Sequence, residues 1–166
     1  MKKFILGWIL GWVAIFVGAF LYVRSGHAPV ATNSGPLPME TFFAKTALHA
    51  TVAPAAKLKS PLPVNSDNLF GGVMVYNHNC AFCHGEPHQN SKIAEGMFPR
   101  PPQLFTPHGM VTDDPVGITF WKVKNGIRLS GMPAFQSKLS QEQMWQVSLL
   151  LSHANQLPAA VGAALK

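Results

Sequence analysis

The stretch Cys80-Ala81-Phe82-Cys83-His84 decides how this sequence is interpreted. Two cysteines three positions apart, followed directly by a histidine, are typical of the covalent attachment of a c-type haem. On one helical turn, residues i and i+3 share a face, so both thiols can reach the two vinyl groups of one porphyrin. His84 then lies beneath the ring with its imidazole aimed at the iron. We therefore predict one covalently attached haem c, held by Cys80, Cys83 and His84.

Zinc binding and dithiol redox chemistry are the alternatives for this cysteine pair. His78 and His88 lie close by in the chain, and zinc accepts mixed sulfur and nitrogen ligands. The sequence contains no second cysteine pair, however, and structural zinc sites usually draw their other ligands from one. The flanking residues offer no βαβ unit of the kind that surrounds a thioredoxin-like pair. Haem attachment is therefore the favoured interpretation.

The segment 125–135 supplies a candidate for the second axial ligand of the iron. Met132 lies between Gly131 and Pro133, which predicts a rigid loop that presents the thioether to a metal. A thioether favours Fe(II), so ligation by histidine and methionine raises the reduction potential. The alternative role for Met132 is to fill a gap in the packing of the loop.

Other donors were compared with Met132. Met97 follows His84 too closely in the chain to cross the ring comfortably. Met144 falls on the apolar face of a predicted helix, where a role in the core is expected. His108 and Met110 lie in a Gly-containing loop and stay open as competing ligands.

With both elements identified, residues 66–166 resemble the class I c-type cytochromes, which are small all-helical electron carriers. The matching segments are the Cys80–His84 motif, residues 131–135 and a C-terminal helix around Trp145. A membrane-anchored bacterial branch is especially similar, because it also carries Pro-Arg-Pro-Pro-Gln-Leu (residues 99–104) and a Phe-Trp pair (residues 120–121). The resemblance implies an all-α haem domain of three to five helices with a loop-rich middle. It also implies a carrier of single electrons between respiratory components, and not an enzyme in itself.

The resemblance assigns roles to further residues. In relatives, a proline carbonyl accepts the Nδ1 proton of the axial histidine, and Pro102 is the best match, with Pro99 and Pro101 as alternatives. Arg100 and Trp121 are candidates to hydrogen-bond a haem propionate, although Trp121 could equally belong to the core.

The resemblance also implies that the first and last helices of the haem domain cross. Small and aromatic residues are expected at the contact, with Gly72 and Tyr76 on the first helix. Trp145 and Leu149 are their expected counterparts on the last. The close approach requires a missing side chain, which Gly72 provides.

The N-terminus predicts a membrane anchor. Residues 4–23 contain no charged side chain, and twenty such positions can cross a bilayer as a helix. Lys2 and Lys3 precede this run, which places the N-terminus in the cytoplasm and the haem domain on the periplasmic side of a bacterial inner membrane. A cleaved signal peptide is the alternative. Gly7 and Gly11 permit close contact with a partner helix in the bilayer, or are ordinary glycines of a membrane helix.

We therefore divide the chain into an anchor (1–24), a tether (25–65) and a haem domain (66–166). The tether is rich in Ala and Pro, which suggests a semi-extended chain. Residues 39–49 interrupt it with helical spacing and are expected to lie along the haem domain or the membrane surface. Within the haem domain, helices are predicted over 67–78, 116–125 and 140–155, with Asn65 or Ser66 as the first N-cap.

The charge distribution excludes nucleic acid as a partner. The net charge is +6, but residues 66–166 carry seven basic against six acidic side chains, while residues 1–65 carry six basic ones against Glu40 alone. The excess therefore lies outside the haem domain. Lys122, Lys124 and Arg128 are candidates for a local patch that steers an acidic redox partner. Two other functions stay open: a haem subunit of a larger dehydrogenase or oxidase, and a sensor or peroxidase-like protein in which Met132 leaves the iron.

Overall fold

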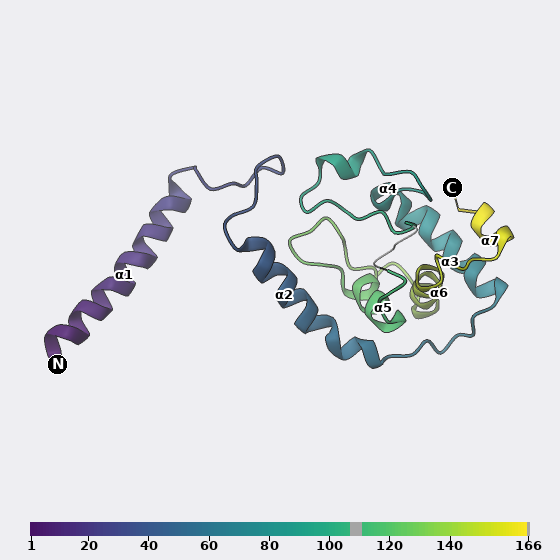
Figure 1. The fold of residues 1–166 in the computed structure, drawn as a ribbon, viewed down its shortest axis with the longest axis horizontal. Coiled ribbons are helices and arrows are strands. Elements are labelled where there is room, and N and C mark those ends of the chain that lie inside the picture. The colour runs from purple at the N-terminus through teal and green to yellow at the C-terminus, as the bar shows by residue number, and fades with distance from the viewer. Residues whose placement is uncertain (107–110, 166) are drawn as a thin grey trace. The chain divides into compact units, whose positions relative to one another are not determined.

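The computed structural model describes residues 1–106 and 111–165, and these residues fold as helices connected by loops (Figure 1). The described part has seven α-helices and two short 3-10 helices, and its only β-type pairing is the isolated bridge between Glu86 and Gln89. The predicted all-α class is therefore confirmed. By contacts, the chain divides into two compact units, Met1–Pro38 and Met39–Lys166.

The first unit is dominated by helix α1 (Lys2–Arg24). None of its residues is buried, so a continuous apolar surface is exposed along the whole helix. By length and composition, α1 is long and apolar enough to cross a membrane. It is the only described helix with these properties, and a secretory signal would have them too.

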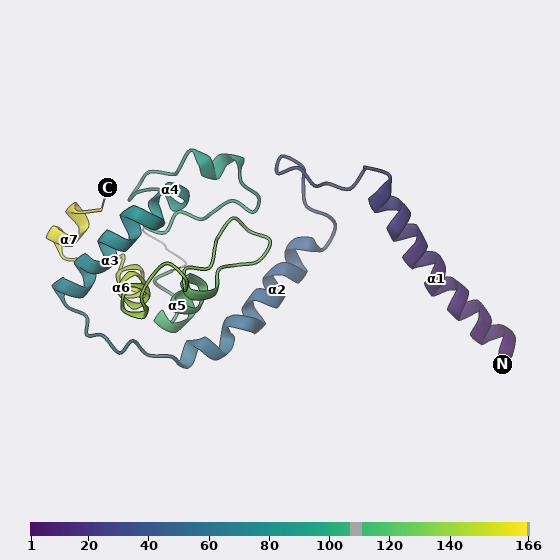
Figure 2. The ribbon, with the colours of Figure 1, turned by 180° about the vertical axis from the view of Figure 1, so that it is seen from behind.

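In the second unit, the core lies between α3 (Ser66–Asn79), α5 (Val116–Asn125) and α6 (Gln141–Ser152). Helix α7 (Ala159–Ala163) follows α6, and both α6 and α7 contact α3 (Figures 1 and 2). The contact between α3 and α6 is the most extensive in the molecule. Side chains from these helices and from Leu104 and Phe105 of the middle loop form one apolar cluster.

The predicted crossing of the first and last helices is present, but its atoms differ from those expected. A Cβ atom at Gly72 would overlap the backbone carbonyl of Gln146 and the side chain of Leu150. Trp145 instead stacks on Phe120 of α5, with ring centroids 3.9 Å apart and planes 11° from parallel. The α6 residues nearest to Gly72 are thus Gln146 and Leu150, each one position after the expected Trp145 and Leu149.

Local signals set the helix ends close to their predicted places. The side chain of Asn65 accepts a hydrogen bond from the Asn68 N–H (2.9 Å) and caps α3. Ser140 and Gln143 form a reciprocal capping box at the start of α6. Gly126 ends α5 with a φ of 67°, as a C-terminal glycine allows. Helix α6 ends at Ser152, three residues before its predicted limit.

Helix α2 (Glu40–Val52) is the short helix predicted within the tether, and a 3-10 helix, η1 (Ala53–Lys57), continues it. This stretch packs on α5, because a Cβ atom at Gly117 would overlap the carbonyl oxygen of Ala55 and lie against Leu58. Val52 and Ala55 are buried in this contact region. From Met39 onward, the chain therefore belongs to the same compact unit as the haem domain.

Candidate haem site

The cysteine motif folds into a single turn directly after α3. Cys80 ends α3 and begins the short helix α4 (Ala81–His84). Its carbonyl accepts hydrogen bonds from the N–H groups of Cys83 (3.1 Å) and His84 (2.9 Å). Both cysteines are free thiols and partly buried. One helical turn therefore carries both thiols on adjacent positions of its surface, as attachment to one porphyrin requires.

Gly85 permits the chain to turn away immediately after His84. Its φ is 81°, and a Cβ atom there would meet the backbone of Gln89 and Ser91. Both conditions favour glycine. The Gly85 carbonyl accepts a 2.7 Å hydrogen bond from the buried hydroxyl of Tyr76, which ties the end of the motif back to α3.

The imidazole of His84 is oriented by a backbone carbonyl. Its Nδ1 lies 2.8 Å from the carbonyl oxygen of Pro102 and donates to it, because a carbonyl can only accept. The Nε2 atom then keeps its lone pair, which is the form that binds a metal. Of the three prolines considered, the structure places Pro102 in this contact. Burial lowers the pKa of His84, although the bond to Pro102 acts in the opposite direction.

The cysteine thiols do not have the environment of a dithiol redox pair. Burial raises the pKa of Cys80 to about 12, with Cys83 adding to the shift. A thiol that stays protonated at neutral pH is a poor nucleophile for disulfide exchange. This environment weakens the dithiol interpretation.

The zinc interpretation is also weakened. Over the described residues, no group of three or more His, Cys, Asp or Glu side chains comes together in a geometry that could hold a metal ion. The Nδ1 atom of His78 is bonded to the Met74 carbonyl at 2.7 Å, within its own helix. Among the described residues, the additional ligands that zinc would need are therefore not assembled around the cysteines.

The loop that carries Met132 is fixed by hydrogen bonds from its backbone N–H groups to backbone and side-chain oxygens. The Ile127 N–H donates to the Met132 carbonyl (3.2 Å), and the Met132 N–H donates to the Ser130 hydroxyl (3.2 Å). Beyond the loop, the Phe135 N–H donates to the Val123 carbonyl of α5 at 3.1 Å. These bonds define the path of the chain on both sides of Met132.

The cysteine motif and the methionine loop meet at the same apolar cluster. Cys80 and Met132 are both partly buried and pack against the core that α3, α5 and α6 enclose. They are 52 positions apart in the sequence. The fold therefore places one predicted attachment point and the predicted thioether ligand at the border of the same apolar cluster.

Sequence reasoning missed a contact between Met97 and the methionine loop. A Cβ atom at Gly131 would overlap the terminal methyl group of Met97, so the two residues touch. We set Met97 aside as an axial ligand because of its distance along the chain from His84, but it lies next to the loop of Met132. The segment from Met97 to Pro102 thus contacts both sides of the predicted site. The glycine before Met132 was the available signal, since it leaves room for a neighbour.

The two residues predicted to bind propionates differ in their exposure to solvent. Arg100 is exposed, and Trp121 of α5 is half-buried, with its carbonyl accepting a 2.9 Å hydrogen bond from Asn125. The buried indole N–H of Trp145, by contrast, has no acceptor in the described part of the chain. A buried donor without a partner is costly, and a bound acceptor such as a propionate would satisfy it.

These observations fit a haem c. Two thiols on one turn, an imidazole with a free Nε2, a thioether on a fixed loop and an unsatisfied buried N–H are the groups that such a cofactor uses. The competing donors His108 and Met110 lie outside the described residues.

The predicted basic patch is smaller than expected. Lys122 forms a salt bridge with Asp114, with 2.7 Å between Nζ and Oδ2, so its charge is locally neutralised. Lys124 and Arg128 are exposed and form no ion pair within the described chain. The salt bridge was not predicted, because it joins a helix residue to a loop residue eight positions earlier in the chain.

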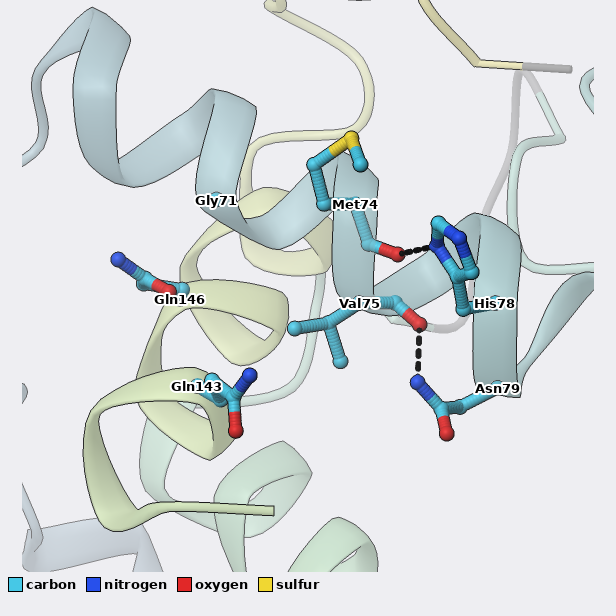
Figure 3. Close-up of a pocket in the computed structure, with 7 residues that line it drawn as sticks. All are labelled: Gly71, Met74, Val75, His78, Asn79, Gln143 and Gln146. Carbon is cyan, nitrogen blue, oxygen red and sulfur yellow. Dashed lines mark hydrogen bonds between the residues drawn. The ribbon is translucent and has the colours of Figure 1, made fainter.

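A pocket of about 260 Å³ lies between α3 and α6, and none of the predicted haem ligands lines it (Figure 3). Its lining residues include Met74, His78 and Asn79 of α3 and Gln146 of α6. The rings and amides of His78 and Asn79 are already bonded to carbonyls of α3, as the dashed lines in Figure 3 show. This open pocket therefore presents no set of free reactive groups.

Residues 68–149 match the family described as cytochrome c oxidase, cbb3-type, subunit III. The matched region runs from α3 into α6, and it includes the cysteine motif, Pro102 and Met132. A comparison with curated proteins finds no match to the chain.

Proposed function

This chain contains a c-type cytochrome domain, and from that premise we propose that it is a membrane-tethered, single-haem carrier of electrons. A c-type domain implies haem c and electron transfer. Beyond this, we propose that His84 and Met132 are the axial ligands and that Cys80 and Cys83 are the covalent attachment points. Each chain would then hold one haem. With both axial positions filled, the protein would have no open site for a substrate.

The observation that carries this proposal is the hydrogen bond from His84 Nδ1 to the Pro102 carbonyl. When bound, the haem supplies a one-electron couple between Fe(III) and Fe(II). The protein orients the imidazole through Pro102 and increases its basicity. The thioether of Met132 favours the reduced state, and the surrounding apolar cluster keeps water away.

Two measurements on the same sample test this assignment. Protein produced in a host competent in cytochrome maturation is analysed by a pyridine haemochrome spectrum and by intact mass. We expect one haem per chain, a mass equal to polypeptide plus haem, and a spectrum typical of two thioether bonds. A colourless protein, or one that has only its polypeptide mass, contradicts the proposal.

The membrane tether is supported by the exposed apolar surface of α1 and by Lys2 and Lys3 before it. In this arrangement the haem domain lies on the periplasmic side of the inner membrane. The same intact mass distinguishes a retained anchor from a cleaved signal peptide. A tethered carrier meets membrane partners at a raised effective concentration.

The partner that we propose is a redox protein with an acidic docking surface. Lys124 and Arg128 are exposed near the methionine loop, and their charges are not neutralised by neighbours in the described chain. Such charges accelerate association at low ionic strength and lose their effect as salt is added.

A second candidate function is that of a haem subunit in a terminal oxidase. The description of the matched family favours it, because that family comprises subunits of a cytochrome c oxidase. Purification from native membranes in mild detergent separates the two candidates. A subunit would be recovered in a stable complex with the other chains of an oxidase, whereas a free carrier would be recovered alone.

A sensor or peroxidase-like function requires Met132 to leave the iron. Binding of carbon monoxide to the reduced protein at neutral pH tests this alternative. The hydrogen bonds that fix the loop on both sides of Met132 favour a retained ligand. We expect no binding in the unmodified protein.

A further inference from the structure

Helix α2 is apolar on two opposite faces, and only one of them is covered. Val52, at its C-terminal end, is 3% exposed, and Ala55 of η1 is 4% exposed. This face docks on α5, where the backbone of η1 lies against Gly117. The contact fixes how α2 is attached to the haem domain.

Two large aromatic side chains of α2 are exposed to solvent, one on the face opposite Val52 and one at the edge of that face. Phe43 precedes Val52 by nine residues, or about two and a half helical turns, which places it on the other side of the helix. Phe43 is 63% exposed, and its neighbour Phe42 is 57% exposed. The two rings contact edge to face, with centroids 5.4 Å apart. Ala47 and Ala50 are exposed on the same side.

The apolar surface continues to the residue before the helix. Met39 is 58% exposed, and it is held in a left-handed conformation with a φ of 66°. A helix whose apolar residues lie on two faces is expected to be covered on both. Contiguous exposed apolar surface of this kind marks a site of contact with a protein or a membrane.

The position of α2 in the chain indicates which of these it meets. The membrane helix ends at Arg24 and α2 begins at Glu40, so fifteen residues separate them. A chain of that length spans at most about 50 Å, so α2 can reach the bilayer surface from the end of α1. Lys57 and Lys59 lie at the end of η1 and just after it, and Glu40 is the only acidic residue between positions 39 and 59. Positive charge favours the anionic headgroups of a membrane surface.

We propose that the exposed face of α2, formed by Met39, Phe42, Phe43, Ala47 and Ala50, lies in the headgroup region of the lipid bilayer. This inference rests on the proposed membrane anchor. Helices with an apolar face that contains phenylalanine and with lysines elsewhere lie in the plane of the interface. The opposite face stays docked on α5, so α2 would hold the haem domain in one orientation on the membrane.

Spin labels on opposite sides of α2 test the inference in the full-length holoprotein. Because haem attachment consumes Cys80 and Cys83, one introduced cysteine is the only free thiol. Ala47→Cys labels the apolar face, and Lys45→Cys is the matched control on the side of Val52. Each labelled protein is placed in vesicles of phosphatidylethanolamine and phosphatidylglycerol. Collision rates with oxygen, which concentrates in lipid, and with a water-soluble nickel chelate are then compared.

We expect the oxygen-to-nickel collision ratio to be several-fold higher at position 47 than at position 45. In the background Phe42→Gln, Phe43→Gln, the ratio at position 47 should fall to that at position 45, while haem content and thermal unfolding stay unchanged. Equal ratios at the two positions in the unmodified background overturn the inference. A label at position 47 that is shielded only in native membranes, and water-exposed in lipid vesicles, also overturns it, because the occupant is then a protein.

Separate measurements show whether the proposed membrane anchor or the proposed haem assignment has failed. Flotation of the protein with the vesicles reports the anchor, and a chain that does not float overturns both the anchor and this inference. A colourless protein overturns the haem assignment alone. The labels are then read in a Cys80→Ala, Cys83→Ala background, where the ratio at position 47 still decides whether α2 meets lipid.

Discussion

His84 and Met132 are held in the predicted site by different groups of the protein. This difference decides which of the two can be tested cleanly by substitution. The orientation of His84 depends on a backbone carbonyl of Pro102, which no side-chain change removes. Met132 depends on its own thioether, at the end of a loop that the backbone holds. Substitution of Met132 is therefore the cleaner test of axial ligation.

Met132→Leu is expected to keep the fold and to change the axial coordination of the haem iron. Leucine matches methionine in volume, so the core should lose less than about 1.5 kcal/mol. The reduction potential should fall by roughly tenths of a volt, since axial ligands set haem potentials over about 0.8 V. The sulfur-to-iron absorption band should disappear, and the reduced protein should bind carbon monoxide. Met74→Leu, at an exposed position on α3, is the control; an unchanged band in Met132→Leu would exclude Met132 as the ligand.

The contact between Met97 and Gly131 predicts an energetic coupling between the two residues. In Gly131→Ala, the new Cβ meets only the flexible end of Met97, so the cost in unfolding free energy should stay near 1 kcal/mol. Gly131→Ala combined with Met97→Ala should cost less than the two changes added, by about 0.5 kcal/mol or more. Denaturant unfolding of the four proteins measures this coupling. Gly96→Ala, where a Cβ meets nothing, is the control, and strict additivity would contradict the contact.

At this scale the sequence predicts motifs better than contacts. The cysteine motif and Met132 were predicted from their own neighbours in the chain, whereas Pro102 was predicted from the resemblance to c-type cytochromes. The Met97 contact, the salt bridge of Lys122 and the buried N–H of Trp145 were not predicted. Each of these depends on a partner, or on the lack of one, that only the fold determines.

Among the elements, α3 and α6 form the framework on which the site is built. Their separation is set at Gly72, where the backbone of Gln146 leaves no room for a side chain. Tyr76, one turn further along α3, is fully buried and bonds to Gly85 after the cysteine motif. The crossing therefore determines where the motif begins.

Gly72→Ala is expected to destabilise the protein, although alanine favours a helix. The new methyl group meets a backbone carbonyl that cannot move alone, and such overpacking costs about 1–3 kcal/mol. Helix propensity returns at most about 1 kcal/mol of this. Thermal unfolding of the holoprotein measures the difference. Gly162→Ala in α7, where nothing lies nearby, should be neutral or stabilising; equal effects at both positions would contradict the account of the crossing.

Element limits were predictable where they depend on local chemistry. Three helix ends lie where they were predicted, because their capping groups act within a few residues. The side chains of Asn65 and Ser140 accept hydrogen bonds from backbone N–H groups of the first turn, and Gly126 ends α5. The packing of η1 on α5 was not predictable, because it depends on Gly117, which lies more than fifty positions further along the chain. The proline and alanine content of residues 25–65 predicted a tether, but Val52 and Ala55 within it are buried.

Within the haem domain, the helices bury many side chains and the loop-rich middle buries few. Helices α3, α5 and α6 bury their side chains against one another. Between α4 and α5, the described chain forms only one short 3-10 turn, η2 (Ile93–Gly96), and contributes few buried side chains, among them Ala94, Leu104 and Phe105. A large apolar cofactor that contacts both regions would stabilise the folded state, because only that state binds it.

Removal of the haem is therefore expected to leave a compact but loosely packed domain. In Cys80→Ala, Cys83→Ala, the substitutions themselves remove little volume, so a large effect reports the missing cofactor. Far-UV circular dichroism should retain much of the helical signal, while near-UV signals and a cooperative thermal transition are lost. Cys80→Ala alone, which keeps one thioether bond, is the control and should still unfold cooperatively. A sharp transition in the haem-free double variant would mean that the helices around Gly72 and Trp145 suffice to fold the domain without the cofactor.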